Sequence, residues 1–327
     1  MKILQTPARF YPYTGGVENY TYHLSRELVK LGHEVSVICA NEPKSDKKEI
    51  DGIKLKKLYF IGKIANTNIT PALPLSILKE DFDILHTQLP TPWSADWSAI
   101  VSAAKRKPLV LTYQNDIVGT GIADHIAEVY NMTALKFLLK QAAKITISHP
   151  NYINFSPHLK KYRKKIVVIP PGVDTGRFQP TDPSIQETIF FLSLLDEFHR
   201  YKGLDLLLEA LKLVKKEIPH IKLKVGGSGK LLQYYREKAA SLGLEDNVEF
   251  LGHVPDEWIP EHYANCNLFV LPSISASQEG FGIVLLEALA SGRPVVTTEI
   301  VGMAEDIKKH KAGIVVKPMD TKALADA

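Results

Sequence analysis

The sequence of 327 residues has little cysteine, no long apolar run and no strong excess of charge. Its two cysteines, Cys39 and Cys266, lie far apart, each inside an expected strand, and have no metal-ligand spacing. This usage is typical of free thiols in a reducing compartment. No apolar run approaches the ~20 residues of a membrane-spanning helix. The first residues, MKILQTPARF, indicate a strand and lack the apolar segment of a signal peptide. We therefore expect a cytoplasmic protein.

The charge balance and composition exclude further classes of protein. The 40 basic and 36 acidic residues give a net charge of +4, which is a mild excess. It favours anionic ligands or an acidic membrane surface, but it is too small to indicate nucleic-acid binding. Hydrophobic residues make up 45% and charged residues 23%, as in ordinary globular proteins. A chain of this length is long enough for two domains with separate cores.

Segments with strand and helix patterns alternate along the first half of the chain. Helices are expected between the strands, including residues 16–31 and 126–142. Strands this apolar, separated by helices, predict a parallel sheet that is covered on both faces. The expected strands are residues 1–5, 34–40, 83–87, 108–113, 145–148 and 166–169.

A stretch rich in proline and glycine, PPGVDTGRFQPTDPS (170–184), interrupts the alternation and indicates an interdomain linker. We therefore predict two parallel-sheet α/β domains, residues 1–178 and 179–327, with a ligand cleft at the carboxyl ends of their strands. The elements expected after the linker are strands 188–194, 221–227, 247–252, 267–272, 294–298 and 313–316, and helices 203–217, 231–242, 256–265 and 281–290.

One carboxylate stands in an otherwise apolar helix, within EGFGIVLLEALASG (279–292). A helix that is apolar on every side is expected to be buried, so Glu287 needs a partner. It could be a structural glutamate satisfied by backbone amides or a lysine. The alternative that we favour is that Glu287 faces a polar ligand at the start of the helix, where Gly282 and unpaired N–H groups form an anion site. Glu279 lies just before it. Such a site suits a phosphorylated sugar or a nucleotide.

Three more turns are candidates for phosphate contact. Lys202 follows the first strand of the second domain, where the cleft is expected, so a phosphate role is favoured over that of a solvated lysine. The glycines of KVGGSGK (224–230) lack the spacing of a dinucleotide fingerprint or a P-loop. A purely structural turn is there as plausible as phosphate contact. TGGVENY (14–20) places Gly15 and Gly16 at a helix start, as a second amide site or a simple cap.

These motifs occur in the order found in a known family. GGVENYTYHLSRELVKLGHEVSVI, DILHTQ, IPPGVDTGRFQP, YKGLDLLLEAL, NLFVLPS and EGFGIVLLEALASGRPVV resemble the large retaining glycosyltransferase family typified by sucrose synthase and phosphatidylinositol mannosyltransferase, family four. The resemblance covers nearly the whole chain, and the two glutamates followed by SGRPVV are its most specific part. It implies a GT-B fold, with two Rossmann-like domains facing a cleft, no metal ion and no other cofactor.

The resemblance also implies roles for individual residues. The nucleotide-sugar donor is held mainly by the second domain, where Glu287 matches the residue that binds the ribose hydroxyls. Glu279 matches the residue beside the transferred sugar, and Lys202 matches the lysine that neutralises the diphosphate. In the first domain, Gly16 belongs to the predicted amide site for the donor. The turn that cradles the phosphates matches Phe281, Gly282 and Ile283.

The sequence departs from the family pattern at three places. Where members have a Gly-Arg pair after the second domain's first strand, this chain has Ser193 and Leu194, so His199 or Arg200 would have to supply the second cation. Where members place a histidine beside the transferred sugar, this chain has Gln114, which cannot carry charge or shuttle a proton. Members also continue beyond DTKALADA, so we expect the final cross-over helices to be missing.

The resulting prediction is a retaining, metal-independent hexosyltransferase that moves a sugar from a UDP- or GDP-linked donor to a hydroxyl acceptor, with Glu279 and Gln114 at the reacting centre. The acceptor could be a glycan, a glycolipid or a small molecule. Because Gln114 replaces histidine, a donor-binding pseudoenzyme or assembly subunit with weak activity stays open. An epimerase of the same fold is a third alternative. The basic run HLKKYRKKI (158–166) is either a solvated face or a peripheral contact with anionic lipid.

Overall fold

The computed structural model describes residues 1–13, 15–64, 67–118, 122–182, 186–276 and 278–327. The chain forms two compact units, Met1–Pro170 and Pro171–Ala327. The predicted boundary, after residue 178, lies later in the chain than the boundary between these units. Phe178 instead packs in the core of the second unit, against Tyr263. Residues 183 and 184 of the predicted linker lie outside the described residues.

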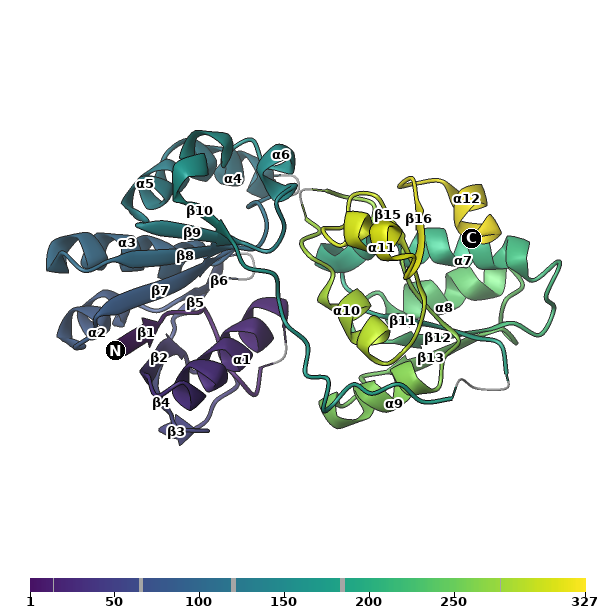
Figure 1. The fold of residues 1–327 in the computed structure, drawn as a ribbon, viewed down its shortest axis with the longest axis horizontal. Helices are drawn as coiled ribbons and strands as arrows, with labels where there is room; N and C mark the ends of the chain where they lie inside the picture. Colours follow the sequence, from purple (N-terminus) through teal and green to yellow (C-terminus); the bar gives the residue numbers. More distant parts are fainter. Residues whose placement is uncertain (14, 65–66, 119–121, 183–185, 277) are drawn as a thin grey trace. The chain divides into compact units, whose positions relative to one another are not determined.

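The first unit is built on an eight-stranded sheet with the order β10-β9-β8-β7-β1-β2-β4-β3 (Figure 1). All neighbouring strands are parallel except the short edge strand β3, which pairs antiparallel with β4. The strands and 3₁₀ helix of the whole unit are β1 (Lys2–Gln5), β2 (Glu34–Ala40), β3 (Glu49–Ile50), β4 (Ile53–Leu58), β5 (Gly62–Ile64), β6 (Thr67–Ile69), β7 (Ile84–Leu89), β8 (Leu109–Tyr113), β9 (Lys144–Ile147), η1 (Lys160–Lys165) and β10 (Ile166–Val168). Of these, β5 and β6 form a separate two-stranded antiparallel sheet.

Helices cover both faces of this sheet. Side chains of α2, α3 and α5 share one core cluster with the central strands. Side chains of α1 pack on the other face, over β2 and β4. This burial on both sides explains why the strands are apolar throughout. The helices are α1 (Gly16–Lys30), α2 (Leu73–Lys79), α3 (Pro92–Lys105), α4 (Ile122–Met132), α5 (Ala134–Gln141) and α6 (Tyr152–Phe155).

The single helix predicted over residues 126–142 is wrong, because two helices occupy this segment. Thr133 separates α4 from α5 with φ −121° and ψ −85°, outside the helical region. Its hydroxyl donates to the carbonyl of Val129 at 2.6 Å. A threonine that bonds to its own backbone in this way competes with regular helix geometry. The apolar spacing alone continues through the break, which is why the sequence pattern missed it.

The second unit has a six-stranded, fully parallel sheet with the order β13-β12-β11-β14-β15-β16. Side chains of α7, α8 and α12 pack on one face, and side chains of α9, α10 and α11 on the other. Its elements are β11 (Thr188–Leu192), η2 (Glu197–Lys202), α7 (Leu204–Val214), β12 (Lys222–Gly226), α8 (Leu232–Ser241), β13 (Val248–Gly252), η3 (Asp256–Trp258), α9 (Ile259–Ala264), β14 (Leu268–Leu271), α10 (Ile283–Ala290), β15 (Val295–Thr298), α11 (Ala304–His310), β16 (Gly313–Val316) and α12 (Thr321–Asp326).

The two cysteines are the subject of a further sequence prediction. Cys39 and Cys266 are both buried and free, and burial raises their pKa values to about 12 and about 11. Cys266 lies before β14 rather than inside a strand, which corrects the prediction.

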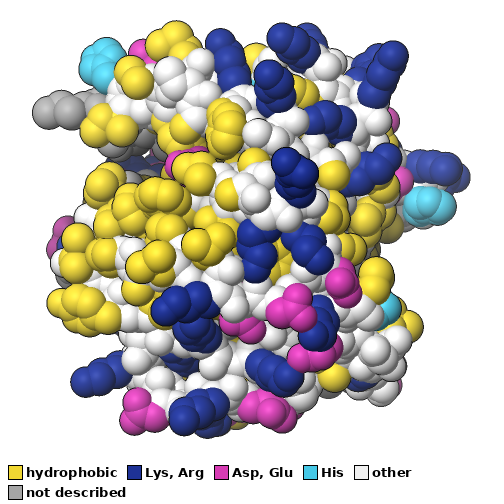
Figure 2. All heavy atoms as spheres, turned by 90° about the vertical axis from the view of Figure 1, so that its left-hand side faces the viewer, with side chains coloured by type: hydrophobic (Ala, Val, Ile, Leu, Met, Phe, Trp, Pro, Cys, Tyr) yellow, Lys and Arg dark blue, Asp and Glu magenta, His cyan; other side chains and the backbone are white. Residues whose placement is uncertain are grey.

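Among the residues placed by the structure, no helix is both long and apolar enough to cross a bilayer. The face shown in Figure 2 carries many Lys and Arg side chains beside groups of hydrophobic ones.

Candidate functional site

The turn before α10 leaves backbone amides unpaired, as the sequence predicts. Gly282 has φ +82°, and a Cβ there would lie 2.7 Å from Val301 Cγ1, so only glycine fits. Leu285 N donates to the Gly282 carbonyl at 2.9 Å, which closes the first turn. Within the described residues, the N–H groups of Phe281, Gly282 and Ile283 have no hydrogen-bond partner. Unpaired amides at the positive end of a helix can bind an anion.

Glu279, directly before this turn, is almost completely buried, with 3% of its side chain exposed. Its two carboxylate oxygens accept hydrogen bonds from Lys202 Nζ at 2.9 and 2.8 Å. Ser273 Oγ donates to Oε2, and Gly280 N donates to Oε1 at 3.1 Å. A buried carboxylate with a cation and two further donors is well compensated for the loss of water. The structure thus brings two predicted site residues, Lys202 and Glu279, into direct contact.

Lys202 is positioned by a turn that requires glycine. It ends η2, and the next residue, Gly203, has φ +82°. A Cβ on Gly203 would lie 2.1 Å from the Pro272 carbonyl oxygen, so this turn packs directly on the chain that follows β14. Burial lowers the pKa of Lys202, but the Glu279 carboxylate and Tyr201 outweigh it and raise the pKa above its usual value. The lysine is therefore firmly cationic.

Glu287 lies on α10 in a different environment from Glu279. Among the described residues its side chain has one hydrogen-bond partner, Tyr263 Oη, which donates to Oε2 at 3.0 Å. Burial raises the pKa of Glu287 to about 7, opposed by the Tyr263 hydrogen bond and the positive charge of Arg177. A partly buried carboxylate with one donor keeps acceptor capacity for a ligand.

Sequence analysis missed Tyr263 and Ser273, the side chains that hold the two glutamates. Tyr263 is fully buried, and its ring packs edge-on against Phe190 and Phe178. A buried tyrosine hydroxyl needs a partner, and this need was the signal in the sequence that could have pointed to Tyr263. Ser273 in NLFVLPS carries no comparable signal, because its role depends on how β14 lies beside Glu279.

The glycine-rich turn at residues 226–229 has a structural explanation. A Cβ on Gly227 would lie 1.7 Å from the Ser193 carbonyl oxygen, and one on Gly229 would lie 2.1 Å from that of Leu195. Leu195 N donates to the Ser228 carbonyl at 3.0 Å, and Leu231 N donates back to the Leu195 carbonyl at 2.8 Å. These glycines are needed so that the turn can pack on the chain after β11, with or without a phosphate.

The two residues proposed to replace the absent arginine both have acidic partners. His199 Nδ1 lies 2.7 Å from Asp196 Oδ1. Arg200 Nη2 lies 3.3 Å from Asp205 Oδ2, and its guanidinium stacks over the Tyr234 ring. Neither contacts the pair of Lys202 and Glu279. A second cation for an anionic ligand would therefore need Arg200 to leave Asp205.

In the first unit, Gln114 follows β8 and belongs to a chain of side-chain hydrogen bonds. Its Nε2 donates to Gln88 Oε1 at 2.7 Å, and Gln88 Nε2 donates to Thr21 Oγ1. The Thr21 hydroxyl donates in turn to the Val17 carbonyl at 2.7 Å. This chain links the end of β8, through the end of β7, to the first turn of α1. It fixes the Gln114 amide so that its carbonyl oxygen is left to accept.

Gly16, predicted as a donor-binding residue, is the first residue of α1. A Cβ built there meets nothing within 4 Å, whereas one on Gly15 would lie 2.4 Å from Glu18 Oε2. Of the two glycines, only Gly15 would meet a neighbour on gaining a Cβ, and the nearest atom is the end of the Glu18 side chain. Glu18 itself is buried and pairs with Arg9 at 3.0 Å, so the acid of this motif is structural. Gly16 and Gln114 lie near the two ends of the same hydrogen-bonded chain.

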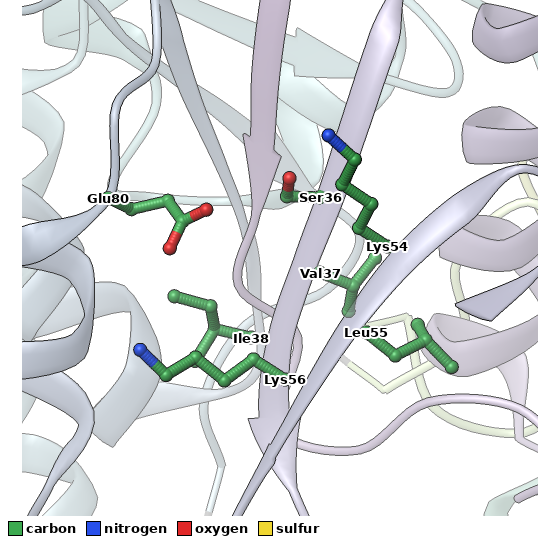
Figure 3. A pocket seen from close by; sticks show the side chains of 7 residues that line it. All are labelled: Ser36, Val37, Ile38, Lys54, Leu55, Lys56 and Glu80. Carbon is green, nitrogen blue, oxygen red and sulfur yellow. The ribbon is translucent and has the colours of Figure 1, made fainter. Parts of the chain in front are cut away.

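A cavity of about 270 Å³ lies elsewhere in the first unit, against β2 and β4 (Figure 3). None of the predicted site residues lines it. Lys54, one of its basic side chains, is paired with Glu34 at 2.6 Å. It is therefore separate from the groups described above. Its lining residues are Ser36, Val37, Ile38, Lys54, Leu55, Lys56 and Glu80.

Comparison with known proteins identifies the family. The model for glycosyltransferase family 4 matches residues 14–177, and that for glycosyl transferases group 1 matches residues 177–327. O-antigen chain mannosyltransferase C of Escherichia coli is 31% identical over 340 residues, which cover 100% of this chain and 87% of the relative. Phosphatidyl-myo-inositol mannosyltransferase of Mycobacterium leprae is 26% identical, over 96% of this chain and 82% of the relative.

Solved structures confirm the fold. Sucrose-phosphate synthase from Thermosynechococcus elongatus matches with a TM-score of 0.79 at 20% identity. The match covers 100% of this chain and 88% of the synthase chain. Anabaena HepE in complex with UDP has a TM-score of 0.75 at 20% identity, with coverage of 100% and 88%. The expected pair of parallel-sheet α/β domains is thereby confirmed. From both family models and the full-length relative, we conclude that this chain belongs to glycosyltransferase family 4 and has the GT-B fold.

Proposed function

We propose that this glycosyltransferase moves a hexosyl group from a UDP- or GDP-linked sugar to a hydroxyl acceptor, with retention of configuration and without a metal ion. The observation that carries the proposal is the buried pair of Lys202 and Glu279 next to the unpaired amides before α10. A diphosphate needs positive charge and N–H donors, and both are available here without a bound cation.

Each group of this site has a proposed role toward the donor. The amides of Phe281, Gly282 and Ile283 bind the diphosphate, and Lys202 neutralises it. Glu287 accepts hydrogen bonds from the ribose hydroxyls, for which its unpaired oxygen is suited. Gly16 offers an amide from the first unit. Neighbours support this choice of donor, since HepE was solved with UDP and with UDP-glucose, and several relatives are named as GDP-mannose-dependent mannosyltransferases.

Retention can be reached by attack on the same face from which the diphosphate leaves. The bond between the anomeric carbon and the diphosphate oxygen breaks, the acceptor oxygen bonds to that carbon, and the acceptor proton passes to the departing diphosphate. Lys202 and the α10 amides stabilise the negative charge that develops on the leaving group. A two-carboxylate route needs a free nucleophile about 5–5.5 Å from an acid. Glu279 is held by three donors, which makes it poorly suited to that task.

Glu279 and Gln114 are the proposed contacts with the transferred sugar. Because Glu279 already holds Lys202, we assign it a second task as the residue that positions the lysine. Gln114 would offer its carbonyl oxygen to a sugar hydroxyl, which needs no change in protonation. The same neutral amide is the observation that favours the second candidate, a donor-binding protein with weak transfer, because glutamine cannot act as an acid or base.

The acceptor and the place of action are also proposals. Several relatives are named for phosphatidylinositol or phosphatidyl-myo-inositol and one for an O-antigen chain, which favours a glycolipid or glycan acceptor. The buried free thiols favour a reducing compartment such as the cytoplasm. A glycolipid acceptor would bring the protein to a membrane surface, so a peripheral membrane contact is part of the proposal.

Calorimetric titration with UDP and GDP, with and without EDTA, tests the proposal. One of the two should bind equally well in both conditions. At 100 times Kd it should stabilise the fold by about 2.7 kcal/mol, because the ligand binds only the folded state. Binding that EDTA abolishes would overturn the metal-free site. No binding of either nucleotide would overturn the donor assignment. Binding without transfer of any hexose from the matching sugar nucleotide would favour the second candidate.

A further inference from the structure

One segment of the first unit is basic without any acidic residue. Residues 129–170 contain no Asp or Glu, although the whole chain has 36 acidic residues. The segment includes α5, η1 and the strands β9 and β10. Its basic residues number eight: Lys136, Lys140, Lys144, Lys160, Lys161, Arg163, Lys164 and Lys165.

The fold brings the basic residues of α5 and η1 together. Tyr162 Oη of η1 donates to the Lys136 carbonyl of α5 at 3.3 Å. Lys165 Nζ donates to the carbonyls of Lys140 and Ala142 at 2.5 and 2.8 Å, at the end of α5. Burial, and next the charge of Lys140, lower the pKa of Lys165. We call the exposed side chains that result the α5–η1 surface: Lys136, Phe137, Lys140, Lys160, Lys161, Arg163 and Lys164.

The cations of the α5–η1 surface are not neutralised by the protein. In the part of the chain that the structure describes, none of them forms an ion pair with a carboxylate. Other exposed lysines are paired, such as Lys54 with Glu34 and Lys63 with Glu42, both at 2.6 Å. Uncompensated positive charge on one surface attracts an anionic partner, and this attraction weakens as salt rises.

Large apolar side chains are exposed on α5 and on the neighbouring helix α4. Phe137 is 41% exposed on α5, next to Lys136. On α4, which packs against α5, Ile126, Val129 and Met132 are 57–59% exposed and spaced by three residues, so they form one stripe. Figure 2 shows hydrophobic side chains beside Lys and Arg at the upper end of the face, where Figure 1 has α4, α5 and α6. Exposed apolar side chains beside cations are typical of helices that lie in a membrane interface.

We propose that the α5–η1 surface and the α4 stripe dock the first unit on an anionic lipid bilayer. The lysines and Arg163 would lie at the level of the lipid headgroups, while Phe137 and the α4 stripe enter the boundary of the acyl chains. A nucleic acid would use the cations but would leave the aliphatic stripe in water. The proposed function includes a membrane contact, and the docking surface assigns residues to that contact. The inference is argued from these side chains alone and does not depend on the donor site.

Co-sedimentation with vesicles tests the inference. The full chain should bind vesicles of phosphatidylcholine mixed with phosphatidylglycerol, bind vesicles of phosphatidylcholine alone much more weakly, and dissociate as salt is raised. The triple variant Lys160→Gln, Lys161→Gln, Arg163→Gln should bind roughly a hundredfold more weakly, because each cation lost near the surface costs about fivefold. Phe137→Ser should also weaken binding severalfold, although it leaves the charge unchanged.

A matched control keeps the change in net charge but moves it to the second unit. Lys212→Gln, Lys308→Gln, Lys309→Gln removes three exposed lysines there and should bind vesicles like the unchanged chain. Equal weakening by both triple variants would overturn the inference, since binding would then depend on net charge alone. Absence of binding to anionic vesicles at low salt would also overturn it. So would a result in which Phe137→Ser binds vesicles normally, while the triple variant at Lys160, Lys161 and Arg163 loses affinity for RNA. Nucleotide titration of the same samples reports the donor site separately, so failure of one proposal is distinguishable from failure of the other.

Discussion

The two units hold their candidate site residues by different means. In the second unit, charged groups are buried and matched to each other at short range, as in the contact of Lys202 with Glu279 at 2.8 Å. In the first unit, the corresponding groups are neutral amides and a hydroxyl, joined in a chain from Gln114 to α1. Buried charge is costly to leave unpaired, whereas a neutral hydrogen bond contributes only about 1 kcal/mol. The second unit should therefore be far less tolerant of change.

The largest expected effect is that of Lys202→Met. It leaves Glu279, 3% exposed, with Ser273 and Gly280 as donors but without a cation. Removing one partner of a buried ion pair typically costs about 3–5 kcal/mol. Because the Lys202 side chain is itself 18% exposed, we expect the lower end, about 3 kcal/mol in the free energy of unfolding. Urea denaturation measures this loss, and nucleotide should no longer raise the stability.

The matched control for this prediction removes both charges. Lys202→Met with Glu279→Gln should recover most of the lost stability, because no uncompensated carboxylate remains. It should still fail to bind nucleotide, since the cation is gone. If Lys202→Met alone unfolds at the same urea concentration as the unchanged chain, Glu279 does not depend on the lysine, and the contrast between the two units disappears.

A smaller effect is expected from Glu287, whose pKa is raised to about 7 from an ordinary value of 4.5. The folded state therefore favours the protonated carboxyl. The stability that protonation supplies is fully present below about pH 4.5 and is lost as pH rises through about 7. Ribose hydroxyls would donate to the ionised form, so nucleotide and proton compete. Affinity for UDP or GDP should be roughly tenfold weaker at about pH 6 than at pH 8.

Glu287→Gln isolates this effect from the titration of the nucleotide's own phosphate. The variant should bind nucleoside diphosphate roughly ten- to a hundredfold more weakly at neutral pH, because bonds to a charged acceptor are worth about 1.5–3 kcal/mol. The steeper pH dependence of the unchanged chain should be absent. Calorimetric titration across the pH range measures both. If the variant binds normally but is much less stable, Glu287 is a structural residue that serves Tyr263.

The same contrast explains what the sequence could predict. The alternation of apolar strands and helices was enough for two parallel-sheet domains, and both family models agree with the quoted motifs. Gly282 was readable because a left-handed turn leaves glycine as the residue that fits. Lys202 and Glu279 lie 77 residues apart, so their contact depends on the register of β11 beside β14, which no local pattern contains. The hydrogen bonds of Gln114 were missed for the same reason.

The smallest change in binding is expected at Gln114. This prediction tests the series of hydrogen bonds between neutral side chains in the first unit. In Gln114→His, an imidazole N–H can donate to Gln88 Oε1 as the amide does now, leaving the second ring nitrogen for the transferred sugar. An interaction made only in the transition state raises kcat and leaves ground-state binding nearly intact. We therefore expect faster transfer with nucleotide affinity changed less than about twofold, well within the ~0.5–1.5 kcal/mol of one neutral hydrogen bond.

The control for this prediction is Gln88→Leu, which removes the acceptor that orients either side chain at position 114. In its background the gain from histidine should be lost, and steady-state kinetics of the unchanged chain, the two single variants and the double variant measure this coupling. Equal rates with glutamine and with histidine at position 114 would show that the site needs no imidazole. A slower Gln114→His would mean that glutamine is the adapted residue. In either case the first unit would contribute shape and hydrogen bonding, and the charges that act on the donor would all belong to the second.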